Sequence, residues 1–140
     1  MVKFLLLALA FGLANAHAQL EGKWFTTAIA ADNADTIEEG GPLRLYAREL
    51  ACIEACNKLE ITFYIKANDQ CTKTKVVANR QADGKYRSQC KYGIWELSLN
   101  KSIVVEGDNI FSPVYATPEF IIFSCHNVNR TGRTTNLIYA

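Results

Sequence analysis

The sequence predicts an all-β protein, an eight-stranded antiparallel up-and-down barrel. Apolar and polar residues alternate with period two in almost every segment, and no long stretch repeats at the 3.6-residue period of a helix. Turn-forming residues separate these segments at spacings of roughly 8–14 residues, as in a meander of short strands. About eight such strands can close into a barrel around one small ligand, and closure removes the long edges of an open sheet. A β-sandwich is the alternative architecture, although sandwiches usually contain Greek-key crossovers.

Residues 1–18 are expected to be a signal peptide rather than part of the fold. A short basic start precedes an apolar run over 4–14, which suits a signal-peptide core and is too short for a membrane span. Small residues follow, so cleavage fits after Ala16 or after Ala18, and we favour Ala18. The mature domain would then be residues 19–140, secreted to the extracellular space. A hydrophobic first helix of a cytosolic protein is the alternative interpretation.

Four strands are expected in the first half of the mature chain. They cover residues 22–30, 43–52, 57–68 and 70–81. The charged, glycine-containing segment 32–42 is a predicted loop, and Asn68-Asp69 marks a hairpin turn. The predicted inward faces carry Leu43, Leu45 and Ala47 on one strand and Leu59, Ile61, Phe63 and Ile65 on the next.

Four more strands are expected in the second half. They cover residues 85–90, 109–117, 119–128 and 134–140. Ala82-Asp83-Gly84 is a strong hairpin signal before the first of them. Thr117-Pro118 separates the middle two, and residues 129–133 form the last turn. The chain therefore predicts consecutive strands joined by tight turns.

The formal charges of the mature chain are balanced. Lys and Arg total 15 against 14 Asp and Glu, and removal of Lys3 with the signal peptide leaves 14 against 14. No basic run or patch stands out, so nucleic acid and anionic membrane surfaces are poor candidate partners. No later stretch is long and apolar enough to anchor the chain in a membrane.

Five cysteines remain after the signal peptide: Cys52, Cys56, Cys71, Cys90 and Cys125. In an oxidising compartment cysteines pair, and an odd number leaves one thiol over. Metal binding at Cys52 and Cys56 is disfavoured because no second Cys/His pair follows at finger spacing. We expect no metal and no other cofactor.

Gly22-Lys23-Trp24, at the start of the first expected strand, resembles the signature of the lipocalin family. Beside it stand the segments GGPLRLYARELAC, CNKLEITFYIK and GRTTNL. Gly-x-Trp alone is a weak signal, but its combination with Cys52-x-x-x-Cys56-Asn57, Phe63-Tyr64 and Cys71, in that order, is specific. Together these segments resemble the odorant-binding protein, aphrodisin and probasin-like subgroup. The resemblance covers residues of about 19–89 and 106–139.

The resemblance implies a secreted carrier that binds small hydrophobic molecules, of odorant or pheromone type, inside the barrel. It places Trp24 at the closed base, as a structural residue rather than a ligand contact. The residues that would line the cavity are Leu43, Leu45, Ile61, Phe63, Val76, Asn109, Phe111, Ile121, Phe123, Cys125 and Leu137. The alternation pattern selects the same faces, and Asn109 would be a polar anchor in an apolar wall. For any single residue, ordinary core packing is the alternative.

The resemblance also implies a disulfide between Cys52 and Cys56. In relatives, Cys71 pairs with a cysteine beyond the last helix, and this sequence contains no such cysteine. Cys71, Cys90 and Cys125 are therefore expected to pair among themselves or to stay free.

Two features depart from the family. Residues 90–105 look like an inserted segment, and the sequence stops at Ala140, without the C-terminal helix that packs on the barrel in relatives. We expect this C-terminally truncated barrel to be less stable than a full-length relative. Two N-glycosylation sequons occur, at Asn129 in the last turn and at Asn100 in the inserted segment.

Two other functions compete with the carrier. One is an incomplete or variant lipocalin that acts through protein interaction, as a homodimer or at an olfactory receptor, or that has no function of its own. The other is a cavity-thiol enzyme, since Cys125 is expected to face the cavity. His126 follows it directly and should point to the opposite face, where it cannot readily activate the thiol. We therefore expect no catalysis.

Overall fold

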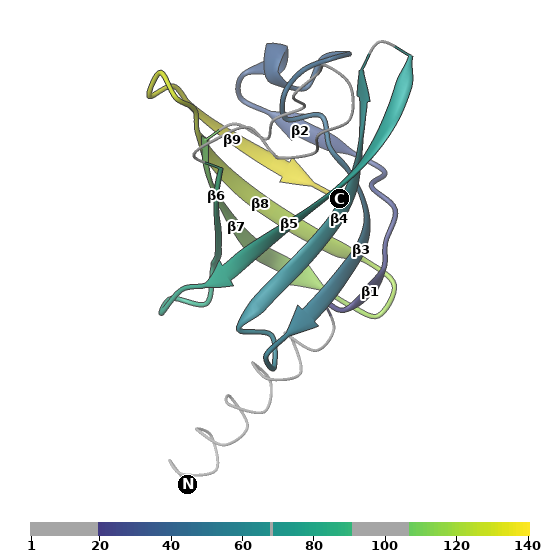
Figure 1. The fold of residues 1–140 in the computed structure, drawn as a ribbon, viewed down its shortest axis with the longest axis vertical. Helices are drawn as coiled ribbons and strands as arrows, with labels where there is room; N and C mark the ends of the chain where they lie inside the picture. Colours follow the sequence, from purple (N-terminus) through teal and green to yellow (C-terminus); the bar gives the residue numbers. More distant parts are fainter. Residues whose placement is uncertain (1–19, 68, 91–106) are drawn as a thin grey trace, which may run out of the picture.

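The computed structural model describes residues 20–67, 69–90 and 107–140. The strands in this part of the chain form one antiparallel sheet that curls on itself (Figure 1). They are β1 (Gly22–Lys23), β2 (Ile29–Ala31), β3 (Tyr46–Ile53), β4 (Lys58–Ala67), β5 (Gln70–Arg80), β6 (Tyr86–Cys90), β7 (Gly107–Ala116), β8 (Ile121–Val128) and β9 (Thr134–Tyr139). A short 3-10 helix, η1 (Ala34–Thr36), follows β2. The order across the sheet is β1-β3-β4-β5-β6-β7-β8-β9-β2, which confirms the predicted meander and excludes a sandwich of two sheets.

The first predicted strand contributes to both edges of this sheet. β1 pairs with β3 at one edge, and β2 pairs with β9 at the other. The prediction of one continuous strand over 22–30 is wrong in this respect, because residues 24–28 leave the ladder and cross between the edges. Just before β2, the backbones of Ala28 and Ala140 exchange hydrogen bonds of 3.1 and 3.0 Å. β1 and β2 are thus two parts of the first predicted strand, and the predicted all-β fold is confirmed as one curled antiparallel sheet.

β3 starts later than the predicted strand 43–52 and breaks its strict alternation. The register with β4 shifts between Ala47 and Glu49, where a β-bulge inserts one residue. A one-residue shift exchanges the two faces of a strand. Leu50 therefore lies on the inward face, where its side chain is 4% exposed.

A disulfide between Cys52 and Cys56 closes the β3–β4 turn, which confirms the pairing that the resemblance implied. Glu54, Ala55 and Cys56 all have positive φ angles, which residues other than glycine rarely adopt. The buried Tyr86 hydroxyl on β6 donates a 2.9 Å hydrogen bond to the Cys56 carbonyl. The covalent link and this hydrogen bond hold a turn that its local sequence disfavours.

The remaining strands match their predicted ranges to within two residues at each end. The β4–β5 turn contains Asp69, whose φ angle is 59°, and the β5–β6 turn contains Gly84, whose φ angle is 84°. In the latter turn, the Lys85 amide donates a 3.0 Å hydrogen bond to the Asp83 carboxylate. Both turns lie where their residues predict them.

The inward faces of the strands form the core. One cluster consists of Leu20, Leu43, Leu50, Leu59, Ala78, Tyr86, Phe111, Ile121, Cys125 and Leu137. A second, smaller cluster consists of Leu45, Phe63 and Ile65. Burial of these side chains is the main stabilising contribution to the fold.

Several expectations fall outside the described residues. These are the signal peptide and its cleavage site, residues 91–105 of the inserted segment, and the Asn100 sequon. Across 20–67, 69–90 and 107–140, the chain forms no helix with the length and apolar character needed to cross a membrane.

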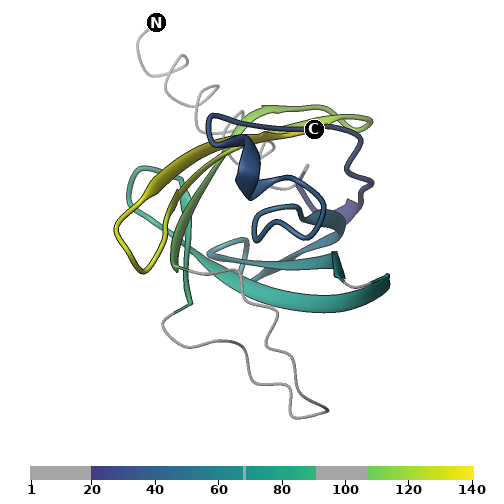
Figure 2. The same ribbon diagram turned by 90° about the horizontal axis from the view of Figure 1, so that it is seen from above.

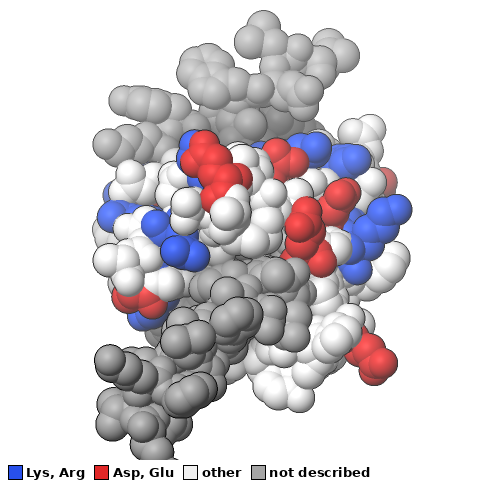
Figure 3. Space-filling view, turned by 90° about the horizontal axis from the view of Figure 1, so that it is seen from below, with Lys and Arg blue, Asp and Glu red and all other residues white. Residues whose placement is uncertain are grey.

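Basic and acidic side chains are interspersed on the end of the barrel that carries the β3–β4, β5–β6 and β7–β8 turns (Figure 3). Lys58 pairs with Glu54 across 3.4 Å at this end. On the described part of this face the charges thus form no field of a single sign, in keeping with the balanced composition.

Candidate ligand-binding site

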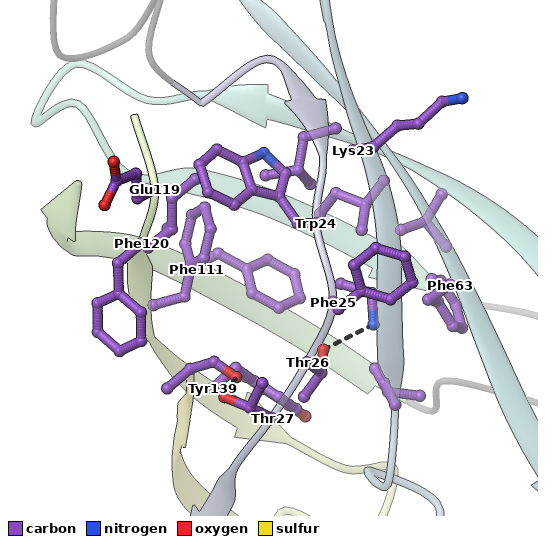
Figure 4. A pocket seen from close by; sticks show the side chains of 18 of the residues that line it. Lys23, Trp24, Phe25, Thr26, Thr27, Phe63, Phe111, Glu119, Phe120 and Tyr139 are labelled. Carbon is purple, nitrogen blue, oxygen red and sulfur yellow. Dashed lines mark hydrogen bonds between the residues drawn. The ribbon is translucent and has the colours of Figure 1, made fainter. Parts of the chain in front are cut away.

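A cavity of about 400 Å³ lies inside the curled sheet (Figure 4). Its deep wall consists of Leu45, Leu50, Ile61, Phe63, Val76, Phe111, Ile121, Phe123 and Tyr139. Ser88 on β6 adds a hydroxyl to a wall that is otherwise almost entirely apolar. Concave, mostly apolar cavities with a few polar groups are typical binding sites for small molecules.

Trp24 closes the end of the cavity next to β1. Its indole Nε1 donates a 2.9 Å hydrogen bond to the carbonyl of Leu20, whose side chain is fully buried. Gly22 has a φ angle of +148°, a conformation that side chains disfavour, and a Cβ there would lie 3.6 Å from the indole nitrogen. The positive φ angle, rather than the space beside the ring, therefore favours glycine in the Gly-x-Trp pair.

The loop that contains η1 covers the opposite, upper end of the barrel (Figure 2). Leu43 in this loop is 3% exposed, and its amide donates a 2.9 Å hydrogen bond to the Thr36 carbonyl. The Tyr139 hydroxyl donates a 2.8 Å hydrogen bond to the Leu43 carbonyl. Burial raises the pKa of Tyr139 above its usual range, so this hydroxyl keeps its proton.

Asn109 lies in a buried polar cluster on β7 and is 1% exposed. Its Oδ1 accepts a 2.9 Å hydrogen bond from Asn127 Nδ2 and lies 3.9 Å from the Cys125 sulfur. Its Nδ2 has no hydrogen-bond partner within the described part of the chain. Ser88 stands directly opposite Asn109 on β6 and lines the cavity. The free amide N–H is therefore a donor close to the polar side of the wall.

Cys125 is 3% exposed, and burial raises the pKa of its thiol to about 12. The thiolate is the reactive form of cysteine. We expect iodoacetamide at pH 8 to modify exposed Cys71 readily and Cys125 about a thousandfold more slowly than an ordinary thiol, as mass spectrometry of the folded protein would show. Unfolding in guanidinium should remove the protection. Rapid labelling of Cys125 in the folded protein would contradict this picture.

The same pKa shift predicts a pH dependence of stability. The unfolded chain releases the Cys125 proton from about pH 9, whereas the folded chain retains it up to about pH 12. The stability that the protonated Cys125 thiol contributes to the folded state is therefore fully present below about pH 9 and is lost as the pH rises toward 12.

Most of the predicted lining residues border the cavity. These are Leu45, Ile61, Phe63, Val76, Phe111, Ile121 and Phe123. The others, Leu43, Asn109, Cys125 and Leu137, are buried but pack in the surrounding core. Leu43 belongs to the loop over the upper end, and the other three lie behind the wall.

Sequence reasoning missed several residues that border the cavity. They are Lys23, Phe25, Thr26, Thr27, Ala47, Leu50, Ser88, Pro118, Glu119, Phe120, Tyr139 and Ala140, and Trp24 was assigned a structural role only. Tyr139 shares its inward face with Leu137, so the period-two pattern could have found it. The pattern could not identify Leu50 because the bulge shifts the register of β3. No pattern indicates that the β7–β8 turn borders the cavity.

Asn129 lies in the β8–β9 turn, where its Oδ1 accepts hydrogen bonds from the Thr131 amide and hydroxyl and from the Arg133 amide, at 3.0, 2.8 and 2.9 Å. Glycosylation of this sequon stays a prediction.

Comparison with known proteins identifies similar sequences. The model of the lipocalin / cytosolic fatty-acid binding protein family matches residues 21–138. An odorant-binding protein of Phodopus sungorus is 54% identical over 125 residues, which are 89% of this chain and 73% of that protein.

Solved structures show the same similarity in three dimensions. The crystal structure of aphrodisin, a sex pheromone from female hamster, is 43% identical with a TM-score of 0.73, and the match covers 86% of this chain and 71% of that one. Bovine odorant-binding protein in complex with undecanal is 28% identical with a TM-score of 0.70, and the match covers 86% and 68% of the two chains.

Proposed function

Because the chain belongs to the lipocalin / cytosolic fatty-acid binding protein family, we propose that it carries small hydrophobic molecules, of odorant or pheromone type, inside its barrel. We propose further that it is secreted, as expected from its N-terminal segment and in keeping with the Cys52–Cys56 disulfide. The bovine relative, in a complex with undecanal, is an odorant-binding protein with an apolar, oxygen-containing ligand. A homodimer and an olfactory receptor stay predicted partners.

The apolar cavity is the observation that carries this proposal. A ligand inside it would contact side chains from β3, β4, β5, β7 and β8, with Phe63 and Phe111 supplying aromatic surface. Burial contributes roughly 25 cal/mol per Å² of apolar surface removed from water, less the cost of immobilising the ligand. We expect dissociation constants of about 1 μM, which correspond to a binding free energy of about −8 kcal/mol.

Displacement of a fluorescent probe tests the proposal. The folded protein should bind 1-aminoanthracene with increased fluorescence, and undecanal should displace the probe in a saturable manner. A denatured sample and the probe alone are the controls. Protein that shows a folded β-sheet circular dichroism spectrum but binds neither compound would exclude a carrier function.

We propose that Asn109 selects ligands that contain an oxygen acceptor. Its unpaired Nδ2 is a donor, and a buried donor without a partner costs about 1–3 kcal/mol, so a small local movement that brings it to a ligand oxygen would be favourable. Such a contact would distinguish aldehydes and alcohols from hydrocarbons.

Asn109→Leu should therefore weaken binding of undecanal about tenfold while changing the binding of undecane much less. Competition against 1-aminoanthracene measures both affinities. Asn136→Leu, the same substitution at an exposed position on β9, is the matched control and should leave the ratio of affinities unchanged. An equal loss for both ligands would indicate a damaged wall rather than a lost hydrogen bond.

Catalysis by Cys125 gains no support from the site. Burial keeps the thiol protonated, and His126 is exposed on the opposite face, with its Nδ1 2.8 Å from Asn136 Oδ1. The relatives from Phodopus sungorus and cattle are named as odorant-binding proteins, and the proposed role is likewise binding without chemistry.

A further inference from the structure

We infer that ligands enter and leave the cavity through a side window between Lys23–Thr27 and the β7–β8 turn at Pro118–Phe120. This inference rests on the proposed carrier function and adds the route of exchange. Both segments border the cavity, and Lys23, Phe25, Pro118, Glu119 and Phe120 among them are exposed to solvent. The deep wall, in contrast, is buried or half-buried. The exposed border residues thus mark where the cavity meets solvent.

Within the described residues, no backbone hydrogen bond closes the window. Residues 24–28 lie outside the sheet ladder, between the end of β1 and the start of β2. The β7–β8 turn is held by its own contacts, since the Thr117 amide donates to the Phe120 carbonyl at 2.8 Å and the Phe120 amide donates to the Thr117 hydroxyl at 3.0 Å. In the described part of the chain, no hydrogen bond joins this turn to Lys23–Thr27. Among residues 20–67, 69–90 and 107–140, only side chains separate the cavity from solvent here.

The two exposed aromatic side chains at the window, Phe25 and Phe120, contact neighbours outside the cavity. Phe25 is 72% exposed, and the Arg48 guanidinium lies 5.2 Å from the centre of its ring. Phe120 is 43% exposed and meets Tyr115 edge-on, with ring centres 6.5 Å apart. Figure 4 shows Trp24 and Phe111 between Phe25 and Phe120. Rotamer changes of exposed side chains are fast, on the picosecond to nanosecond scale, so this window can open without a backbone rearrangement.

The upper end offers no comparable route. No residue of 28–44 borders the cavity, and Leu43 is buried beneath its loop. Exit there would break the hydrogen bonds from Tyr139 to Leu43 and from Leu43 to Thr36 and would expose apolar core. Such local opening costs free energy that rotation of Phe120 does not.

Stopped-flow binding of 1-aminoanthracene tests the window. Phe120→Ala should widen it and raise the association and dissociation rate constants together, by about threefold or more, because a gate changes both rates equally. Glu119→Trp should narrow it and lower both. The equilibrium dissociation constant should stay within about twofold in each variant. Ile37→Ala, which loosens the loop over the upper end, is the control and should leave both rates unchanged.

Three results would overturn the inference. Faster exchange in Ile37→Ala with unchanged rates in the window variants would place the route at the upper end. A rise in the dissociation rate alone in Phe120→Ala would make Phe120 a wall contact rather than a gate. Equilibrium titration of the unsubstituted protein separates this inference from the proposed function, since wild-type binding with unaltered rates in all variants refutes only the window.

Discussion

Replacing Val76 by tryptophan is expected to lower the affinity of the protein for 1-aminoanthracene about a hundredfold, a loss of about 3 kcal/mol. Val76 lies on β5 directly opposite Ile61 on β4, and both side chains border the cavity. An indole at this position would extend into the cavity of about 400 Å³ and fill part of the space that the ligand needs. Because the indole and the ligand would compete for the same space, the ligand would be largely excluded. Fluorescence titration measures the loss.

The neighbouring residue supplies a matched control. Val77 is the same residue type on the same strand, but its side chain points outward and is 45% exposed. Val77→Trp should bind the probe as the unsubstituted protein does, and both variants should show the same β-sheet circular dichroism spectrum. Wild-type affinity in Val76→Trp would mean that ligands bind outside the barrel.

The Val76–Val77 pair also shows what the sequence could predict. Alternation separates inward from outward residues wherever a strand is regular, as in β4, where Ile61 and Phe63 border the cavity and Thr62 does not. It failed on β3, because the bulge at Ala47–Glu49 exchanged the faces and brought Leu50 inward. A bulge leaves no residue signature in this segment, since none of its residues is glycine.

The position of a residue along the barrel axis was the second property that the sequence did not predict. Leu45 and Leu137 were both predicted to line the cavity, and both are buried, but only Leu45 borders it. The period-two pattern tells which face a side chain occupies, whereas the position of a void depends on how neighbouring strands stagger. The same limit applies to the β7–β8 turn, whose residues Pro118–Phe120 border the cavity together with Lys23–Thr27.

Replacing Trp24 by alanine should lower the free energy of unfolding by about 3 kcal/mol, a large part of the roughly 5–15 kcal/mol that stabilises a typical domain. The substitution removes the side chain that fills the end of the cavity and the indole hydrogen bond to the Leu20 carbonyl. It also uncovers Leu20, which is fully buried in the intact protein. Urea unfolding followed by circular dichroism measures the change, because the signal does not depend on the lost tryptophan.

Phe25→Ala distinguishes a specific role of Trp24 from a general loss of aromatic surface. The two residues are adjacent, but Phe25 is 72% exposed and its main contact is the cation–π pair with Arg48. Its removal should cost less than about 1 kcal/mol. If the two substitutions destabilise the protein equally, the barrel does not depend on the indole at its base, and the Gly-x-Trp pair has no special structural role. A much larger cost at Trp24 would instead show that the stability of the barrel depends on the indole next to β1 and on its hydrogen bond to the Leu20 carbonyl.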